Sequence, residues 1–433
     1  MSRRSASRSN VVEPGKPRLL QILGPGLVTG AADDDPSGIA TYSQAGAQFG
    51  FRLGWTLLLT YPLMVVIQSI SARIGRTTGL GIAGNVRRLY PKWLLYGIVG
   101  ALTFANVCNI GADLGAMAET GRLLLPAAPS WSLLALFAVV CAGGQIFMQH
   151  KRYVAILKWL TLSLFAYFAV LCIVHVRWSQ LLLGLIWPRF SLDKGFWLMV
   201  AAILGTTISP YLFFWQAAQE VEDTKTEPIR RPLVQRPAQG ASALPRIRLD
   251  TLIGMAISNL VALAIMATAA ATLHSSNIKE IDSAAQAAEA LRPLAGSFAF
   301  GLFSLGIIGT GLLSVPVLAG SAAYALGEAR RWPVGLSRQP MQAKAFYGTI
   351  AAATLVGAVA NILKVSPMKA LVWSAVLNAI VAVPIMVLIM QMAINPTTMG
   401  QFTISRRSRV VGWIATFVMG IASLGFIISL IFG

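Results

Sequence analysis

Three consecutive carboxylates, Asp33, Asp34 and Asp35, lie in the middle of an apolar stretch and are followed at once by Pro36 and Gly38. A charge near the centre of a bilayer costs about 3 kcal/mol, and the stretch contains no Lys or Arg to offset it. A bound cation is the simplest way to compensate such charges. Partial protonation of the acids, or water at a cavity mouth, are the alternatives. Successive helical residues point about 100° apart, so the three acids cannot all face one site. We expect Asp35, at the interruption itself, to be a direct metal ligand, with Asp34 beside or behind it.

A second apolar stretch is interrupted in its middle by Gly205, Thr206, Thr207, Ser209 and Pro210. Proline removes a backbone donor and glycine weakens a helix by about 1 kcal/mol, so both stretches are expected to unwind. Unwound backbone is tolerated at membrane depth only where it is buried in protein or lines a wet cavity, and its carbonyls then become ligands. Such carbonyls and hydroxyls are hard oxygen donors, which suit Mg²⁺, Ca²⁺ or Mn²⁺. The hydroxyls, that of Thr207 above all, have the alternative of bonding a carbonyl one turn earlier.

A third apolar stretch carries Asn106, Asn109 and Asp113 at spacings of three and four residues. These spacings place the three side chains on one face of a helix. Such a face is suited either to relaying ions or water or to binding a neighbouring helix. Asn109 and Asp113 are therefore candidates for an ion relay and equally for a structural contact.

The composition indicates what kind of element must position these residues. Of the 433 residues, 56% are hydrophobic and 12% are charged. A soluble domain has roughly 25% charged residues, so an ordinary soluble enzyme is excluded. Apolar windows of about 19 residues predict eleven spans and therefore an all-α polytopic membrane protein. The predicted spans are 20–48, 53–74, 93–121, 131–149, 153–176, 196–222, 251–273, 298–327, 345–364, 369–393 and 410–431.

The two interrupted stretches are the first and the sixth of these spans. This separation suggests two repeats of five spans, 20–176 and 196–393, followed by an eleventh helix, 410–431. Because five is an odd number, consecutive units enter the membrane from opposite sides and form an inverted repeat of the LeuT type. The alternative is that Pro36 and Pro210 are ordinary kinks, but kinks alone leave the three acids unexplained.

The distribution of charge predicts the orientation. The net charge is +19, but it is spread over short loops rather than gathered in one patch, so we expect no nucleic-acid partner. Most of the 35 Lys and Arg residues lie in the tail 1–19 and in loops on the same side, which predicts a cytoplasmic N-terminus and an external C-terminus in the inner (plasma) membrane. The Pro- and Arg-rich connection from Asp223 to Asp250 is expected to be a flexible cytoplasmic loop. The bilayer and a transported ion are the expected partners, and nothing in the sequence indicates an obligate protein partner.

The motifs at both interruptions resemble those of the Nramp family of divalent metal transporters. The family's first span carries Asp-Pro-Gly-Asn and then a QAGAQFGY-like stretch, and the sequence has DPSG at 35–38 and QAGAQFG at 44–50. The family's sixth span carries Met-Pro-His, and the sequence has SPY at 209–211. The resemblance implies a LeuT-type fold of eleven or twelve helices, alternating access, and a metal ion bound at the midplane between the first and sixth spans.

The resemblance also implies a ligand set. The family's aspartate corresponds to Asp35, its asparagine to Gly38 and its methionine to Ser209, and its carbonyl ligands would come from Ala32 and Thr206. Loss of the sulfur and of the asparagine side chain leaves a wider, all-oxygen site, which favours hydrated Mg²⁺ over Mn²⁺ and Fe²⁺. In this respect the chain is most similar to the Nramp-related magnesium transporters. The transported cation, Mg²⁺ or Mn²⁺, is then the expected ligand, and no cofactor is expected.

Proton coupling depends on positions at which the sequence departs from the family. Tyr211 stands where the family has histidine, and Asn109 stands where its third span carries an acid, with Asp113 one turn later. Tyrosine, with an ordinary pKa of about 10, is a poor proton carrier. We therefore predict uniport driven by the membrane potential, which supplies about 4.6 kcal/mol per 100 mV to a divalent ion. The alternatives are a proton-coupled Mn²⁺ or Fe²⁺ importer and a sodium-coupled carrier of an organic solute; no nucleophile and base have the spacing of an enzyme.

Overall fold

The computed structural model describes residues 29–30, 32–147, 165–191, 193–226, 229–363 and 365–432. Every regular element within these ranges is a helix, and nine helical segments among them are long and apolar enough to cross a membrane. They account for ten of the eleven predicted spans, because the first two are joined into one segment, Pro36–Thr78. The first half of the other predicted span, 153–176, lies outside the described residues. The prediction of an all-α polytopic membrane protein is confirmed.

The first predicted break is present. The backbone is helical at Asp33, bends at Asp34 and is extended at Asp35 (φ −69°, ψ 170°). Helix α3, Pro36–Phe49, then begins at the proline, which fits a first turn because the N–H that it lacks would have no partner there. Asp35 caps α3 by accepting a hydrogen bond from the backbone N–H of Gly38. The aspartate and the proline thus restart the helix together.

The second predicted break is also present. Helix α11, Lys194–Thr207, ends where Ile208 and Ser209 leave the helical conformation, and α12, Pro210–Thr226, begins at the second proline. Nearly all residues around this break are buried. Unwound backbone is therefore enclosed by protein, as its unpaired polar groups require at membrane depth.

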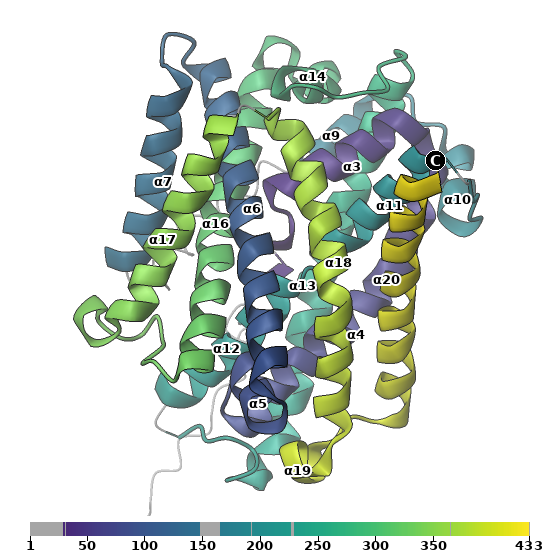
Figure 1. Ribbon diagram of the computed structural model, residues 1–433. Helices are drawn as coiled ribbons and strands as arrows, with labels where there is room; N and C mark the ends of the chain where they lie inside the picture. The colour runs from purple at the N-terminus through teal and green to yellow at the C-terminus, as the bar shows by residue number, and fades with distance from the viewer. Residues whose placement is uncertain are drawn as a thin grey trace, which may run out of the picture.

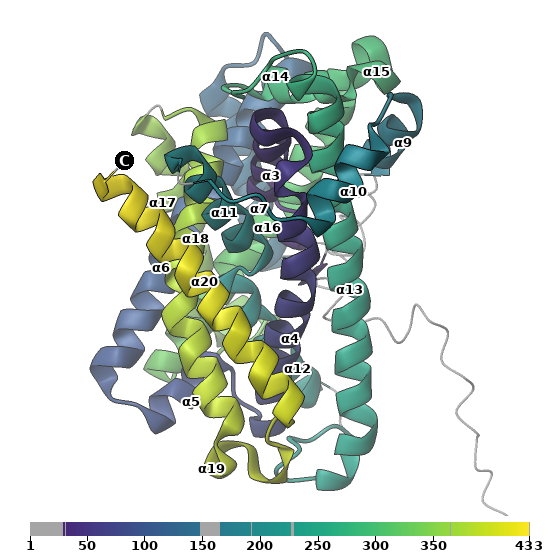
Figure 2. The ribbon, with the colours of Figure 1, turned by 90° about the vertical axis from the view of Figure 1, so that its right-hand side faces the viewer.

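Long helices surround the two breaks. Figure 1 shows α6, Lys92–Leu124, and α18, Pro367–Ile394, running beside one another, and α6 packs also on α16, Ala299–Arg330. Figure 2 shows α13, Gly240–Ala269, along α4, Gly54–Thr78, and α13 also contacts α3. These helices therefore approach the breaks from several sides.

Small residues allow the closest of these contacts. A Cβ atom on Gly205 of α11 would collide with the carbonyl of Ala375 in α18, and one on Gly46 of α3 would collide with the carbonyl of Met266 in α13. Helices in a bilayer associate through such close backbone packing, since lipid offers no hydrophobic drive between them. The glycines thus bring α18 and α13 directly against the two broken helices.

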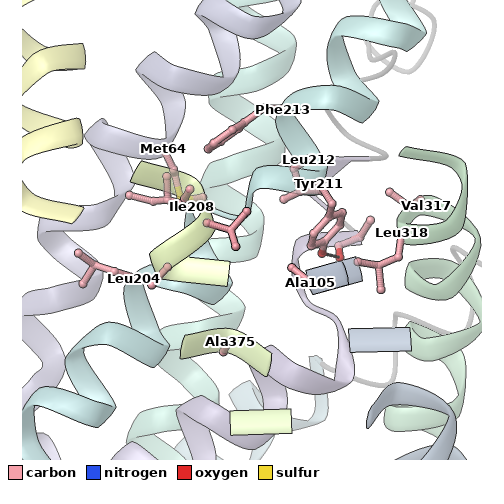
Figure 3. Close-up of a cluster of buried hydrophobic side chains, with 14 of the residues drawn as sticks. Met64, Ala105, Leu204, Ile208, Tyr211, Leu212, Phe213, Val317, Leu318 and Ala375 are labelled. Carbon is pink, nitrogen blue, oxygen red and sulfur yellow. Dashed lines mark hydrogen bonds between the residues drawn. The ribbon is translucent and has the colours of Figure 1, made fainter. Parts of the chain in front are cut away.

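A buried apolar cluster encloses the second break (Figure 3). Ile208, Tyr211 and Phe213 from the break and the start of α12 lie among side chains of α4, α6, α16 and α18, and all are fully buried. The labelled neighbours from those four helices are Met64, Ala105, Val317, Leu318 and Ala375. This packing encloses the backbone of the break in protein on several sides.

The outer helices and the short ones complete the bundle. Those on its outside are α7 (Ser130–Phe147), α17 (Lys344–Ala360) and α20 (Arg406–Phe432). Those at the lower end in Figure 1 are α5 (Ile82–Leu89) and α19 (Pro396–Met399). Those at the upper end are α9 (Ala166–Ile173), α10 (Trp178–Ile186) and α14 (Ala284–Ala288). The C-terminal end of α20 lies at the upper end.

One expectation requires correction. The connection from Asp223 to Asp250 is not a loop throughout, because α12 continues to Thr226 and α13 begins at Gly240. Arg246 on the early part of α13 donates to both carboxylate oxygens of Glu220 on α12, at 2.9 and 2.7 Å. This bidentate pair, with a carboxylate that is only 1% exposed, joins the two helices. A pattern of apolar residues could not reveal it.

Candidate metal-binding site

The Asp35 carboxylate lies between the first break and two other helices, and it is 1% exposed. Its Oδ1 accepts hydrogen bonds from the Ser37 hydroxyl at 2.6 Å and from the Gly38 N–H at 2.7 Å. Its Oδ2 accepts from the Asn109 amide of α6 at 3.1 Å and from the Tyr211 hydroxyl of α12 at 3.5 Å. All four donors are neutral and no basic side chain pairs with Asp35 within the described residues. Its negative charge therefore has no protein counter-ion in the part of the chain described.

Tyr211 connects the two breaks. Its hydroxyl donates to the carbonyl of Ala32 at 2.9 Å, so the residue predicted as a relay group lies against a carbonyl predicted as a ligand. The Ser37 hydroxyl lies 3.4 Å from that of Thr206 at the second break. The structure thus gathers Asp35, Ala32, Thr206 and Tyr211 in one small, buried region.

Gly38 lies at the edge of this region and has little free space. A Cβ at this position would lie 3.3 Å from the Thr206 hydroxyl, 3.3 Å from the Asp33 carbonyl and 3.3 Å from the Tyr42 ring. Glycine thus brings the start of α3 close to the second break. Even a single Cβ at position 38 would require these neighbours to move by a few tenths of an ångström.

The hydroxyls of the second break are used within their own segment. Ser209 donates to the carbonyls of Gly205 at 2.7 Å and Thr206 at 2.8 Å, and Thr207 donates to that of Ile203 at 2.7 Å. Of the two roles considered for Thr207, the structure therefore shows the intrahelical one. Ser209 keeps its oxygen lone pairs, but its proton is directed to carbonyls that the break leaves without N–H partners.

Asp34 lies with Asp33 in a separate contact. The Ser258 hydroxyl of α13 is 2.7 Å from Asp33 Oδ2 and 3.1 Å from Asp34 Oδ1, and both acids are buried. Asp33 Oδ1 has no hydrogen-bond partner among the described residues. Asp34 therefore contacts α13, whereas Asp35 contacts α6 and α12, and Asp34 lies behind Asp35. Ser258 was missed by sequence reasoning because nothing distinguishes it from other serines in apolar helices.

The polar residues of α6 make contacts of both kinds considered for them, with the region of Asp35 and with a neighbouring helix. Asn109 contacts Asp35, whereas Asn106 donates to the Leu318 carbonyl at 2.9 Å and to Ser321 at 2.7 Å on α16. Asp113, one turn beyond Asn109, accepts from the Ser314 hydroxyl of α16 at 2.8 Å. The remaining oxygens of Asn109 and Asp113 have no partner within the described chain. A polar path thus leads from Asp35 along α6.

Asn378 is a second residue whose surroundings the sequence did not indicate. It lies on α18 and is fully buried, yet neither its amide nitrogen nor its oxygen has a hydrogen-bond partner among the described residues. Its neighbours Ala375 and Ala379 press directly on Gly205 at the second break. Gln391 of the same helix, by contrast, accepts a hydrogen bond from Tyr90 at 2.9 Å.

The donor set fits a hard cation. Within the described residues no three His, Cys, Asp or Glu side chains form a group that could hold a metal, and Cys108, Cys141 and Cys172 are free. An ion at the breaks would therefore be held by one carboxylate, by carbonyl and amide oxygens, and by water. Mg²⁺ and Mn²⁺ accept such oxygen ligands, and Mg²⁺ in particular retains several waters.

Two broken helices that meet at a buried carboxylate within a helical bundle define a LeuT-type transporter fold. The manganese transporter of Eremococcus coleocola has this fold, with a TM-score of 0.77 and 17% identity over 97% of this chain and 89% of that one. MhsT in complex with L-phenylalanine gives a TM-score of 0.59, over 93% of this chain and 98% of that one, at 15% identity.

Sequence comparison then identifies the family. The family described as natural resistance-associated macrophage protein-like matches residues 26–429, and the chain belongs to this Nramp family. The "Divalent metal cation transporter MntH" of Aeromonas hydrophila is 30% identical over 348 residues, 77% of this chain and 80% of that protein. The protein of the same name from Verminephrobacter eiseniae is 28% identical over 373 residues, 83% of this chain and 82% of that protein.

Proposed function

We propose that this protein transports a divalent metal cation across the membrane, with Asp35 as its charged ligand. The observation that carries the proposal is a buried carboxylate with four neutral donors and no basic partner in the described chain. A divalent cation supplies the missing positive charge. Relatives that share 80% or more of their length with this chain bear the name of divalent metal cation transporter.

Transport requires that this site open to each side in turn. In this proposal the repeats 20–176 and 196–393 move against one another about the ion, and the helix 410–431 stands outside the repeats. Helix α5, at the lower end in Figure 1, carries Arg87 and Arg88, which supports a cytoplasmic location for that end. The tail 1–19 would then be cytoplasmic and the C-terminus external, in the inner (plasma) membrane.

The preferred cargo in this proposal is Mg²⁺, with Mn²⁺ as a second cargo, as in the Nramp-related magnesium transporters. Gly38 and Ser209 provide neither the amide nor the sulfur that the usual Nramp motif has at these positions. A site without a soft ligand does not discriminate in favour of Mn²⁺ or Fe²⁺. The groups beside Asp35, Tyr211 and Asn109, are neutral, which favours uniport over proton coupling. The membrane potential alone supplies about 4.6 kcal/mol per 100 mV to a divalent ion.

A second candidate function is proton-coupled transport of Mn²⁺ or Fe²⁺. Two observations favour it. The first is the manganese transporter with the same fold. The second is Asp113, a buried carboxylate one turn from Asn109 whose Oδ1 is unpaired among the described residues. Such a group is a candidate proton acceptor at the end of the polar path on α6.

Uptake into proteoliposomes tests both candidates together. The vesicles hold a pH-sensitive dye and an inside-negative potential, and Mg²⁺ or Mn²⁺ is added outside. We expect Mg²⁺ to enter without acidification, the Asp35→Ala variant to be inactive, and Asp282→Ala, which removes an exposed carboxylate paired with Lys369, to be normal. Entry of Mn²⁺ with acidification and without Mg²⁺ entry would establish the second candidate instead. Normal uptake by Asp35→Ala would refute the site.

A further inference from the structure

A cavity of about 700 Å³ is lined by no described residue of the two breaks, and α10, which contributes to its lining, lies at the upper end of the bundle in Figure 1. Three separate segments line it: the 3-10 turn Gly50–Leu53 that follows α3, the helix α10 with its flanking residues, and the turn Ala270–His274 that ends α13. Helix α10 packs against the 3-10 turn Gly50–Leu53 and against α4, and Figure 2 shows it near the upper end of the bundle. The cavity is therefore formed by tertiary packing of distant segments and not by a single loop.

The charged groups that line this cavity are all basic. Arg52 comes from the 3-10 turn, and Arg177 and Arg189 come from either side of α10. His175 and His274 add two imidazoles, and no Asp or Glu is present among the described lining residues. None of the three arginines forms an ion pair within the described chain. All three side chains are exposed, and together they form a positive surface that attracts an anion.

His274 is oriented by the fold. Its Nδ1 lies 2.8 Å from the carbonyl of Ala47, and a carbonyl can only accept, so Nδ1 carries the proton. The ring also rests against Gly50, where a Cβ would lie 3.2 Å from Cδ2 and 3.3 Å from Nε2. Gly50 has φ +60°, which an L side chain rarely adopts. In the neutral ring Nε2 is then an acceptor, so His274 forms part of the cavity wall and the arginines are the donors available to an anion.

One flank of the cavity is apolar and exposed. Leu183 and Trp187 line it and are 57% and 68% exposed, and α10 also exposes Leu182 and Ile186. Trp178, at the start of α10, is exposed as well. Apolar residues bordered by tryptophan are typical of the level at which lipid headgroups meet the acyl chains. The cavity thus combines cationic groups with an exposed apolar surface.

We propose that this cavity binds the phosphate group of an anionic phospholipid. The planar guanidinium groups of Arg52, Arg177 and Arg189 match phosphate oxygens in pairs, and Leu183 and Trp187 contact the glycerol and the first methylenes. Inorganic phosphate shares the headgroup chemistry, but it makes no use of the apolar flank. A phospholipid is the one of these two ligands that fits both the basic residues and the apolar flank of the cavity.

Native mass spectrometry of the full-length protein released from detergent measures the retained lipid. We expect phosphatidylglycerol to be retained by the wild type, and about tenfold less by Arg177→Gln/Arg189→Gln, since two charge-assisted contacts are removed. The matched control, Arg406→Gln/Arg407→Gln, removes the same charge from exposed positions at the opposite end and retains lipid normally. Equal retention by both double variants, whether high or low, would overturn the proposal. The single variant Arg189→Gln, in an exposed loop, gives the same comparison if the double variant does not fold.

A second arm separates the two sources of phosphate. Trp187→Ser removes the apolar flank and leaves the arginines, so we expect lower retention of phosphatidylglycerol and unchanged binding of inorganic phosphate, measured by titration calorimetry in lipid-depleted detergent. Binding of inorganic phosphate by a protein that retains no phosphatidylglycerol would overturn the lipid assignment. Binding of neither would overturn the site.

Discussion

The break before Pro36 and the break before Pro210 both restart a helix at a proline, but their chemistry differs. The first contains three carboxylates in succession, and the second contains no ionisable side chain between Gly205 and Pro210. At the first, the side chain of Asp35 caps the new helix and accepts hydrogen bonds from two other helices. At the second, the Ser209 hydroxyl returns to carbonyls of its own segment.

This difference assigns distinct tasks to the two breaks. A charge in a buried site dominates the interaction with a cation, so the first break determines whether an ion binds. Neutral carbonyl oxygens contribute less each, and their number and spacing determine which ion fits. The variants below test this division, beginning with the largest expected effect.

The largest effect is expected from Asp35→Asn. Asparagine caps helices as well as aspartate does, so α3 is retained while the negative charge is lost. We expect Mg²⁺ and Mn²⁺ binding to weaken by at least about 100-fold, or about 2.7 kcal/mol, as measured by titration calorimetry. Asp34→Asn is the matched control within the same break. Because Asp34 contacts Ser258 and not the groups around Asp35, binding should change by less than about threefold. Equal losses in the two variants would mean that the carboxylates act as one ligand.

The sequence predicted the breaks because their cause is local. Proline and glycine in an apolar stretch interrupt a helix wherever they occur, so Pro36 and Pro210 were sufficient evidence. The partners of the acids were not predictable, since Ser258 and Ser314 lie more than 200 residues away in sequence from the carboxylates that they contact. Pairings of this kind depend on tertiary packing, which periodicity does not encode.

The next largest effect is a loss of stability, expected when the hydrogen bonds of Asp33 and Asp34 are removed. Ser258→Ala removes the hydroxyl that Asp33 and Asp34 share, and a buried polar group without its partner costs about 1–3 kcal/mol. We expect the free energy of unfolding to fall by about 2 kcal/mol, measured by thermal unfolding in detergent. Ser275→Ala, whose exposed hydroxyl bonds carbonyls of its own turn, should change it by less than about 0.5 kcal/mol. A Ser258→Ala protein as stable as the wild type would show that the two acids do not depend on this donor.

A third variant places the missing ligands in both breaks. Gly38→Asn with Ser209→Met restores the amide and the sulfur of the usual family motif, and we expect the preference to shift toward Mn²⁺ by about tenfold, since a soft ligand favours transition metals. Competition between Mn²⁺ and Mg²⁺ in proteoliposome uptake measures the shift.

The control for this variant is Gly38→Ala with Ser209→Ala. It introduces a Cβ at position 38, which must displace neighbours at 3.3 Å, but adds no ligand. A similar shift in both double variants would mean that the width of the site, and not ligand softness, sets the selectivity.

The smallest effect is expected from Asp113→Asn, which tests whether the polar path on α6 extends the first break into a proton route. Asparagine retains the shape of Asp113 and can still accept the hydrogen bond from Ser314. In a uniporter this carboxylate carries no proton with the ion, so Mg²⁺ uptake under an inside-negative potential should change by less than about twofold. The dye inside the vesicles should report no acidification in either protein. If the wild type acidifies the vesicles and the variant does not, Asp113 is the proton acceptor. The first break would then supply the charged metal ligand and α6 the coupling group, while the second break would supply only neutral oxygens.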